Sequence, residues 1–431
     1  MRISITIAFA ALIGALTPVA AVFGQQPAAA EDVSLATELA RHKYALTLDG
    51  GKLEGPGAEF LVREASTAEF VLIGEDHGIG SIPDFAAALY RRIAPLGFGH
   101  LVVEAGPLSG AAVERMARSA DPHAAFAQFN REHPFALPFF SWLEECRLAE
   151  TAVRSSAASR PVIWALDQEF VLSAPVHFAR LAAIAPNPRA KALAVEYQRR
   201  AENEYAAMVA SHNPSDVFLV AAKAEDFDRL ESAFAARPGS EAARILGELR
   251  VSWEIYVKNG DGRGYQSNLQ RSELMKQHFM EYYRAAERAE RRPPRAVFKF
   301  GAFHMKRGRS VTNVFDIGNL ASELAVSNGS HSFHILVIAA SGTQNGYYPF
   351  VGNPDDKHKP IDAVGSFDFM DVKPLLDAAG ATGVSVIDLR PLRAVVGRRS
   401  SGEIDAGLKD AIFGYDAVLV IHDAKAATLF E

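Results

Sequence analysis

The chain has 431 residues, of which 49% are hydrophobic, and this supplies enough apolar material for one large core or two smaller ones. Such a composition argues against a chain that is mainly disordered. Its 45 basic and 51 acidic residues give a formal net charge of −6, which argues against nucleic acid as a partner.

The first thirty residues have the layout of a secretory signal peptide. Arg2 precedes an apolar run over residues 3–16, and small residues follow it. We expect residues 1–24 to form the signal, with cleavage after Gly24 or, alternatively, after Ala30. The run is shorter than the roughly 20 residues of a membrane-spanning helix. The sequence therefore predicts a periplasmic or secreted protein with no stable membrane span after cleavage, and the alternative is a retained N-terminal anchor.

Short apolar runs bounded by glycine and followed by helical patterns recur from residue 70 onward. Such runs are typical of buried strands in a parallel sheet, and their alternation with helices predicts an α/β fold with a mainly parallel sheet flanked by helices. The predicted strands lie at 70–73, 100–103, 161–165, 296–300, 334–338, 384–387 and 417–421, and the clearest helices at 81–94, 108–119, 139–155 and 311–327.

The interval 175–291 lacks this alternation and is almost wholly helical in pattern. We interpret it as a helical subdomain inserted into an α/β domain that consists of residues 31–174 and 292–431. Residues 31–69 form a lead-in of mixed pattern. Residues 341–380 are rich in Gly, Pro, Asp and aromatics without periodicity, which predicts a long ordered loop.

Acidic or histidine side chains directly follow four of the predicted strands. Glu75, Asp76 and His77 follow the first, Glu104 the second, Asp167 the third and His304 the fourth. Because the carboxyl ends of parallel strands share one edge of the sheet, where ligands bind, we expect these side chains to converge in one pocket. The alternative for each of them is a cap on the helix that follows.

Two short motifs resemble a known group of proteins. The stretch Gly74-Glu75-Asp76-His77, followed by a helix and by Glu104, is similar to the opening of erythromycin esterase-like and ChaN-like proteins. The same group, together with the Tiki proteases, carries a second Gly-x-x-His late in the chain, here Gly301-Ala302-Phe303-His304. The resemblance covers residues 70 to 425.

Further stretches resemble the esterase branch of this group. They are Trp164–Gln168, Tyr415–Leu419 and a helix that carries Asn268, Arg271 and Met275. The first motif instead follows the ChaN and Tiki branches, because a single residue separates Glu75 from His77. The resemblance implies a hydrolase that acts on a small-molecule or peptide substrate.

We expect this chemistry to be the cleavage of an ester or amide bond by an activated water. His77 or Glu75 would take a proton from the water, because imidazole titrates near neutrality and burial raises the pKa of a carboxylate toward it. His304 would stabilise the developing oxyanion or protonate the leaving group. Glu104 and Asp167 would orient the two histidines.

The candidate substrate-binding residues are Arg271, Asp76 and Asn268. The guanidinium of Arg271 suits an anionic part of a substrate. Other catalytic frameworks are absent from the sequence, which contains neither a Gly-x-Ser-x-Gly elbow nor a phosphate-binding P-loop. The single cysteine, Cys146, cannot form an intramolecular disulfide, and we expect it to be a packed residue.

Three alternatives remain open at this point. Glu75, His77, Glu104 and His304 offer mixed nitrogen and oxygen ligands for Zn²⁺ or Mn²⁺, as in a Tiki-like metal-dependent protease, and the other possibility is no cofactor at all. A ChaN-like protein would instead bind haem or iron through histidine. The third alternative is an inactive surface interaction protein that retains the fold.

Overall fold

The computed structural model describes residues 34–346, 358–398 and 403–430, so the signal-peptide prediction falls outside the described residues. The elements below belong to the unit Leu35–Glu431. Its sheet strands are β1 (Lys43–Asp49), β2 (Lys52–Glu54), β3 (Phe70–Glu75), β4 (Phe98–Val103), β5 (Ile163–Ala165), β6 (Arg295–Gly301), β7 (Ser332–Ala339), β10 (Val384–Asp388) and β11 (Ala417–Ile421).

Among the described residues, these nine strands form one sheet in the order β2-β1-β10-β11-β7-β3-β6-β4-β5. The pairs from β11 to β5 are parallel, whereas β10, β1 and β2 pair antiparallel at the other end. A mainly parallel sheet is therefore confirmed. The register places Glu75 beside Gly301, and Val103 beside both Lys299 and Ala165.

Helices cover both faces of this sheet, which is why its central strands β3, β4 and β7 are buried at every position and consist mainly of apolar residues. On β3, Val71 and Ile73 face one apolar cluster, while Phe70 and Leu72 face the other. The first cluster is packed against α2 (Pro56–Thr67), α3 (Ser81–Ile93), α4 (Pro107–Ala117), α5 (Pro122–Glu132) and α6 (Leu143–Ser155). The 3₁₀ turn η1 (Ala94–Leu96) follows α3.

The second face is covered by one helix from the start of the chain and by several from its second half. They are α1 (Leu35–Arg41), α12 (Gly264–Glu290), α13 (Ala302–Met305), α14 (Ile317–Ser327), α15 (Ala363–Ser366), α16 (Lys373–Ala379), α17 (Leu392–Arg398) and α18 (Ala406–Gly414). On α12, Met275, Phe279 and Tyr283 recur every four residues, so they lie on one helix face and enter the cluster of this side of the sheet.

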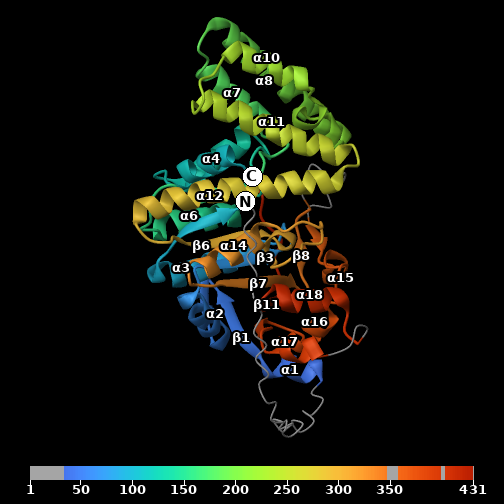
Figure 1. Cartoon of the computed structure of the whole chain (residues 1–431). Helices are drawn as coiled ribbons and strands as arrows, with labels where there is room; N and C mark the ends of the chain where they lie inside the picture. The colour runs from blue at the N-terminus through green and yellow to red at the C-terminus, as the bar shows by residue number, and fades with distance from the viewer. Residues whose placement is uncertain (1–33, 347–357, 399–402, 431) are drawn as a thin grey trace, which may run out of the picture. The chain divides into compact units, whose positions relative to one another are not determined.

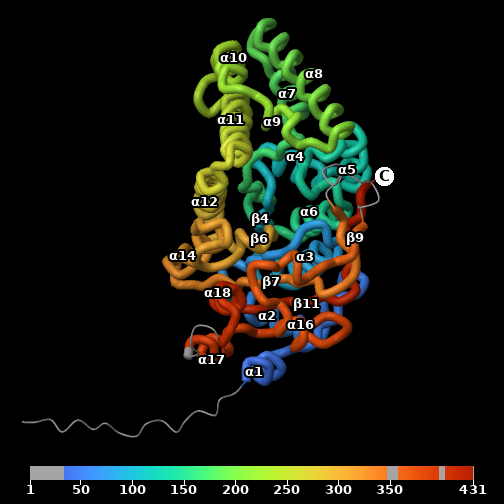
Figure 2. Tube along the Cα trace, turned by 90° about the vertical axis from the view of Figure 1, so that its right-hand side faces the viewer, coloured from blue at the N-terminus to red at the C-terminus, as the bar shows by residue number. Residues whose placement is uncertain are grey.

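The described residues between β5 and α12 contain helices and no strands. They are α7 (Ala174–Ala183), α8 (Pro188–Ser211), η2 (Pro214–Asp216), α9 (Phe218–Ala221), α10 (Ala224–Phe234) and α11 (Glu241–Gly260). These helices share an apolar cluster of their own, and they gather together in Figure 1. Figure 2 shows α12 between α11 and the strands β4 and β6. The domain boundaries at 174 and 291 stay a prediction.

Several details of the sequence-based prediction were wrong. The lead-in 31–69 contains β1 and β2, which were missed, and the predicted loop 341–380 contains β8 (Thr343–Gln344), β9 (Lys359–Pro360), α15 and α16. Residues 347–357 of that loop lie outside the described residues. Two helices begin later than predicted, at Leu143 and Ile317 instead of 139 and 311. Within the described residues, no helix is long and apolar enough to cross a membrane.

Candidate active site

The predicted strand-end residues lie at one edge of the sheet. The neighbouring parallel strands β3, β6, β4 and β5 end side by side, and they deliver Glu75, His304, Glu104 and Asp167 to that edge. Residues more than 200 positions apart in the sequence thereby come together.

His77 is held by a carboxylate on one ring nitrogen and faces a second carboxylate with the other. Its Nδ1 lies 2.8 Å from Glu75 Oε1, and its Nε2 lies 3.5 Å from Glu104 Oε2. The His77 side chain is 34% exposed, whereas that of Glu75 is 2% exposed. Because a carboxylate accepts from Nδ1–H, this contact favours the tautomer that leaves Nε2 free to accept a proton.

His304 repeats this arrangement from the other motif. Its Nδ1 lies 2.8 Å from Asp316 Oδ2, and its Nε2 lies 3.4 Å from Glu104 Oε1. Asp316 is the N-cap residue of α14, where its other carboxylate oxygen accepts from Ile317 N at 2.7 Å. Each imidazole thus has its own carboxylate on Nδ1, and both turn Nε2 toward the same glutamate.

Glu104 is the centre of the cluster. Besides the two histidines, it accepts from Gly301 N at 2.7 Å and from Arg271 Nη2 at 2.7 Å. The absence of a side chain at Gly301 leaves room for the imidazole, because a Cβ atom at this position would lie 3.0 Å from His77 Nε2, closer than ordinary van der Waals contact. Burial raises the pKa of Glu104, but His304, His77 and Arg271 outweigh it and hold the pKa well below the ordinary value. Glu104 is therefore an ionised acceptor.

The two histidines have raised pKa values. Burial alone lowers the pKa of His77, but Glu104 and Glu75 outweigh burial and raise it above 6.5. Burial likewise opposes the charged form of His304, yet Asp316 and Glu104 raise its pKa to about 10. His304 is accordingly protonated at neutral pH, so its Nε2–H can donate a hydrogen bond or a proton.

Arg271 reaches the site from α12 and is clamped by two acids. It donates through Nε and Nη2 to Asp167 at 2.8 and 2.5 Å, and through Nη2 to Glu104. Asp167 therefore orients Arg271, and we find no contact of Asp167 with either histidine among those of the described residues. The contacts of Asp167 therefore support a role in orienting Arg271 instead of the predicted role in orienting a histidine.

A hollow of about 250 Å³ opens over these groups, and we call it the polar hollow. Asp76 lines it as well, and its Oδ2 accepts from Gln344 Nε2 and Ser366 Oγ, which tie the β8 and α15 segments to the first motif. Asn268 lies three residues before Arg271 on α12, is half-buried and is not part of the lining. The full lining is Glu75, Asp76, His77, Glu104, Arg271, Gly301, Ala302, Phe303, His304, Ser366 and Phe367.

Sequence reasoning missed three residues that support His77. Lys299, on β6, lies 2.5 Å from Glu75 Oε1 and 2.6 Å from Glu145 Oε1, and all three side chains are nearly inaccessible. Phe139 stacks on the His77 ring with centroids 4.4 Å apart, and it adopts a left-handed φ of 63°. The only signal for Lys299 was a lysine inside an otherwise apolar strand, two residues before a Gly-x-x-His motif.

The four predicted metal ligands do not converge on one point. Glu75 Oε1 is engaged by His77 Nδ1 and Lys299, on the side of the imidazole remote from Glu104. The oxygens of Glu104 accept from the backbone N–H of Gly301 and from the cationic guanidinium of Arg271. Within the described ranges, no group of three or more His, Cys, Asp or Glu side chains is arranged to hold a metal ion. The donor set does not fit a metal.

Comparison with solved structures identifies the fold of the chain. No protein-family profile and no curated protein sequence matches the chain. A solved structure of a histidine-to-asparagine mutant of the erythromycin esterase EreC, in its open conformation, matches with a TM-score of 0.59. The two are 14% identical, and the match covers 90% of this chain and 99% of the esterase. The chain has the erythromycin esterase-like fold.

Two further solved structures are similar to this chain. A protein from Bacillus cereus is 15% identical with a TM-score of 0.54, and a succinoglycan biosynthesis protein is 12% identical with a TM-score of 0.56. Each match covers 92% of this chain and 98% of the other chain. The resemblance that the two Gly-x-x-His motifs indicate is therefore confirmed for the erythromycin esterase-like fold.

Proposed function

We propose that the protein is an exported hydrolase that cleaves an ester or amide bond with an activated water in the polar hollow. The observation that carries this proposal is the pairing of His77 and His304, which come from distant parts of the sequence and turn Nε2 toward one carboxylate. Export is supported by the signal-peptide pattern of residues 1–24. The likeness in fold to an erythromycin esterase agrees with this reaction class.

His77 is the proposed base. Its Nε2 accepts a proton from water while the water oxygen adds to the carbonyl carbon of the substrate, and Glu75 on Nδ1 stabilises the imidazolium that forms. The exposure of His77 gives water and substrate access to this nitrogen. The function of Glu75 is then to orient and stabilise the base, since Lys299 and His77 hold the pKa of Glu75 low despite its burial.

His304 is the proposed acid. Its Nε2–H first donates to the oxygen on which negative charge develops, and it then protonates the leaving oxygen or nitrogen as the bond to the carbonyl carbon breaks. Asp316 keeps the imidazole protonated and oriented. The proton gained by His77 and the one lost by His304 are exchanged with solvent after the products leave.

A panel of p-nitrophenyl esters and anilides tests this function. We expect hydrolysis by the purified protein, a loss of at least about 100-fold in the His304→Ala variant, and wild-type rates in His331→Ala, whose side chain is exposed outside the site. A protein that cleaves none of the panel, yet gives a Soret band with hemin that the His77→Ala variant loses, would contradict the proposal in favour of haem binding.

The pH dependence of kcat/KM follows from the two histidines. The base works only when His77 is neutral, so the rate rises with pH through a pKa above 6.5. The acid works only while His304 is protonated, so the rate falls as pH passes about 10. We expect a bell-shaped profile with these two limbs in a buffer series from pH 5 to 11. An acid limb below pH 6 would disagree with His77 as the base.

A further inference from the structure

A second hollow adjoins the polar hollow along α13. Ala302 and Phe303 line both hollows. The second one, which we call the apolar hollow, has a volume of about 20 Å³. Its lining is Ala302, Phe303, Lys306, Val311, Leu336, Phe369, Met370, Gly407, Asp410, Ala411 and Tyr415.

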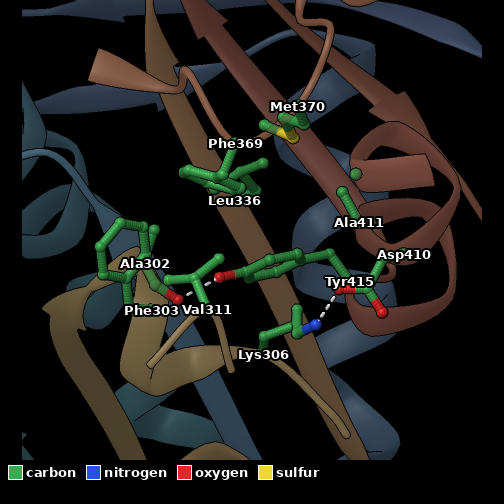
Figure 3. A pocket seen from close by; sticks show the side chains of 11 residues that line it. Ala302, Phe303, Lys306, Val311, Leu336, Phe369, Met370, Asp410, Ala411 and Tyr415 are labelled. Atoms are coloured by element: carbon green, nitrogen blue, oxygen red, sulfur yellow. Dashed lines mark hydrogen bonds and ion pairs between the residues drawn. The ribbon is translucent and has the colours of Figure 1, made fainter. Parts of the chain in front are cut away.

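The few polar groups of the apolar hollow are already satisfied. Figure 3 shows the Tyr415 ring crossing the hollow with its hydroxyl directed at Ala302, and this hydroxyl donates to Ala302 O at 2.5 Å. Lys306 forms an ion pair with Asp410. The remaining walls are aliphatic and aromatic. The hollow therefore offers mainly apolar surface, and an apolar group bound there would lose contact with water while the Tyr415 and Lys306 contacts stay in place.

An apolar surface connects the two hollows. Phe367 lines the polar hollow, and its ring lies 5.8 Å from that of Phe369 in the apolar hollow. Phe369 in turn makes an edge contact with Phe303 at 5.1 Å. Phe303 and Val311 are each 40% exposed, which is unusual for large apolar side chains that neighbour each other around a hollow.

We propose that the apolar hollow is a substrate subsite, which takes a short alkyl group of the ester or amide that is cleaved in the polar hollow. This inference rests on the proposed function and names its substrate class. The shared wall of Ala302 and Phe303 places the alkyl group next to the bond that is cleaved. A volume of about 20 Å³ fits a group of methyl to ethyl size, since one water needs about 10–15 Å³ on the same measure.

A series of p-nitrophenyl acetate, butyrate and octanoate tests the subsite. We expect kcat/KM of the wild type to rise about tenfold from acetate to butyrate, because the terminal ethyl group of the butyryl chain enters the hollow, and to rise no further for octanoate. In Ala411→Leu, which fills the hollow, we expect the butyrate-to-acetate ratio to fall to about one. The matched control is Ala406→Leu on the exposed start of the same helix, α18.

A second variant covers the case in which Ala411→Leu does not fold. Val311→Ala removes an exposed wall of the hollow, and we expect its octanoate-to-butyrate ratio to rise several-fold. Unchanged ratios in a folded Ala411→Leu, or in Val311→Ala, would overturn the subsite while leaving the hydrolase intact. A wild type that cleaves no ester of the series, nor any substrate of the wider panel, would instead remove the proposed function, and the subsite with it.

Discussion

Replacing His77 by alanine is expected to lower kcat/KM for ester hydrolysis by about 10²- to 10⁴-fold, the usual contribution of a positioned acid or base. In the proposed mechanism the His77 imidazole accepts the proton of water, and neither Glu75 on its Nδ1 nor Glu104 facing its Nε2 is expected to replace it. Glu75 is buried and paired with Lys299, and Glu104 is held ionised by Arg271 and His304.

Chemical rescue separates this catalytic role from a structural one. His77 is 34% exposed, so its removal opens a space that solutes reach from solvent. We expect added imidazole to restore part of the activity of His77→Ala and to leave the rate of His331→Ala unchanged. A loss of less than tenfold in His77→Ala would exclude this histidine as the base.

Replacing Lys299 by methionine is expected to destabilise the fold by about 3–5 kcal/mol, the usual result when one partner of a buried ion pair is removed. The Lys299 side chain is 4% exposed and lies between Glu75 and Glu145, which are 2% and 7% exposed. Without the cation, two buried carboxylates face each other. The change in the urea midpoint measures the loss.

A second substitution shows whether charge is the cause. Adding Glu145→Gln to Lys299→Met removes one of the two unpaired carboxylates, so the double variant is expected to be more stable than Lys299→Met alone. The surface pair of Lys373 and Asp377 supplies the control, because Lys373→Met should change stability by no more than about 0.5 kcal/mol. A Lys299→Met variant as stable as Lys373→Met would contradict the stabilising role of the buried ion pairs of Lys299 with Glu75 and Glu145.

Lys299 and Glu145 are expected to shift the pH profile of kcat/KM in opposite directions when each is replaced. The charge of Lys299 lowers the pKa of His77, so its removal should move the acid limb of kcat/KM to higher pH. Glu145 interacts with His77 in the opposite sense, so Glu145→Gln should move the acid limb to lower pH. Any shift of both variants in the same direction would contradict the electrostatic origin.

The central sheet could be predicted because its strands are buried on both faces and therefore form nearly continuous apolar runs in the sequence. Phe70–Ile73 are apolar at four successive positions, as two covered faces require, and the histidine and acid that follow mark the end of the strand. The antiparallel strands β1 and β2 were missed. They lie at one end of the sheet, and within each of them exposed residues alternate with buried or half-buried ones. Short, half-exposed strands carry a weak signal.

The candidate site was predictable where a residue follows a strand, and much less so where it reaches the site from elsewhere. Glu75, Glu104 and His304 follow from strand ends alone. Asp316 forms its contact with His304 from the N-cap of α14, and Glu145 reaches Lys299 from the first turn of α6. Which long side chain meets which partner depends on helix packing, and a single sequence does not encode this in a local pattern.

The most direct test of the account is a double-mutant cycle on His77 and His304, measured as kcat/KM for one ester. If the two imidazoles act on the same transition state, the His77→Ala/His304→Ala double variant should be hardly less active than the weaker of the two single variants. Losses that multiply in full, or a single variant that retains wild-type activity, would contradict a shared site for the two histidines.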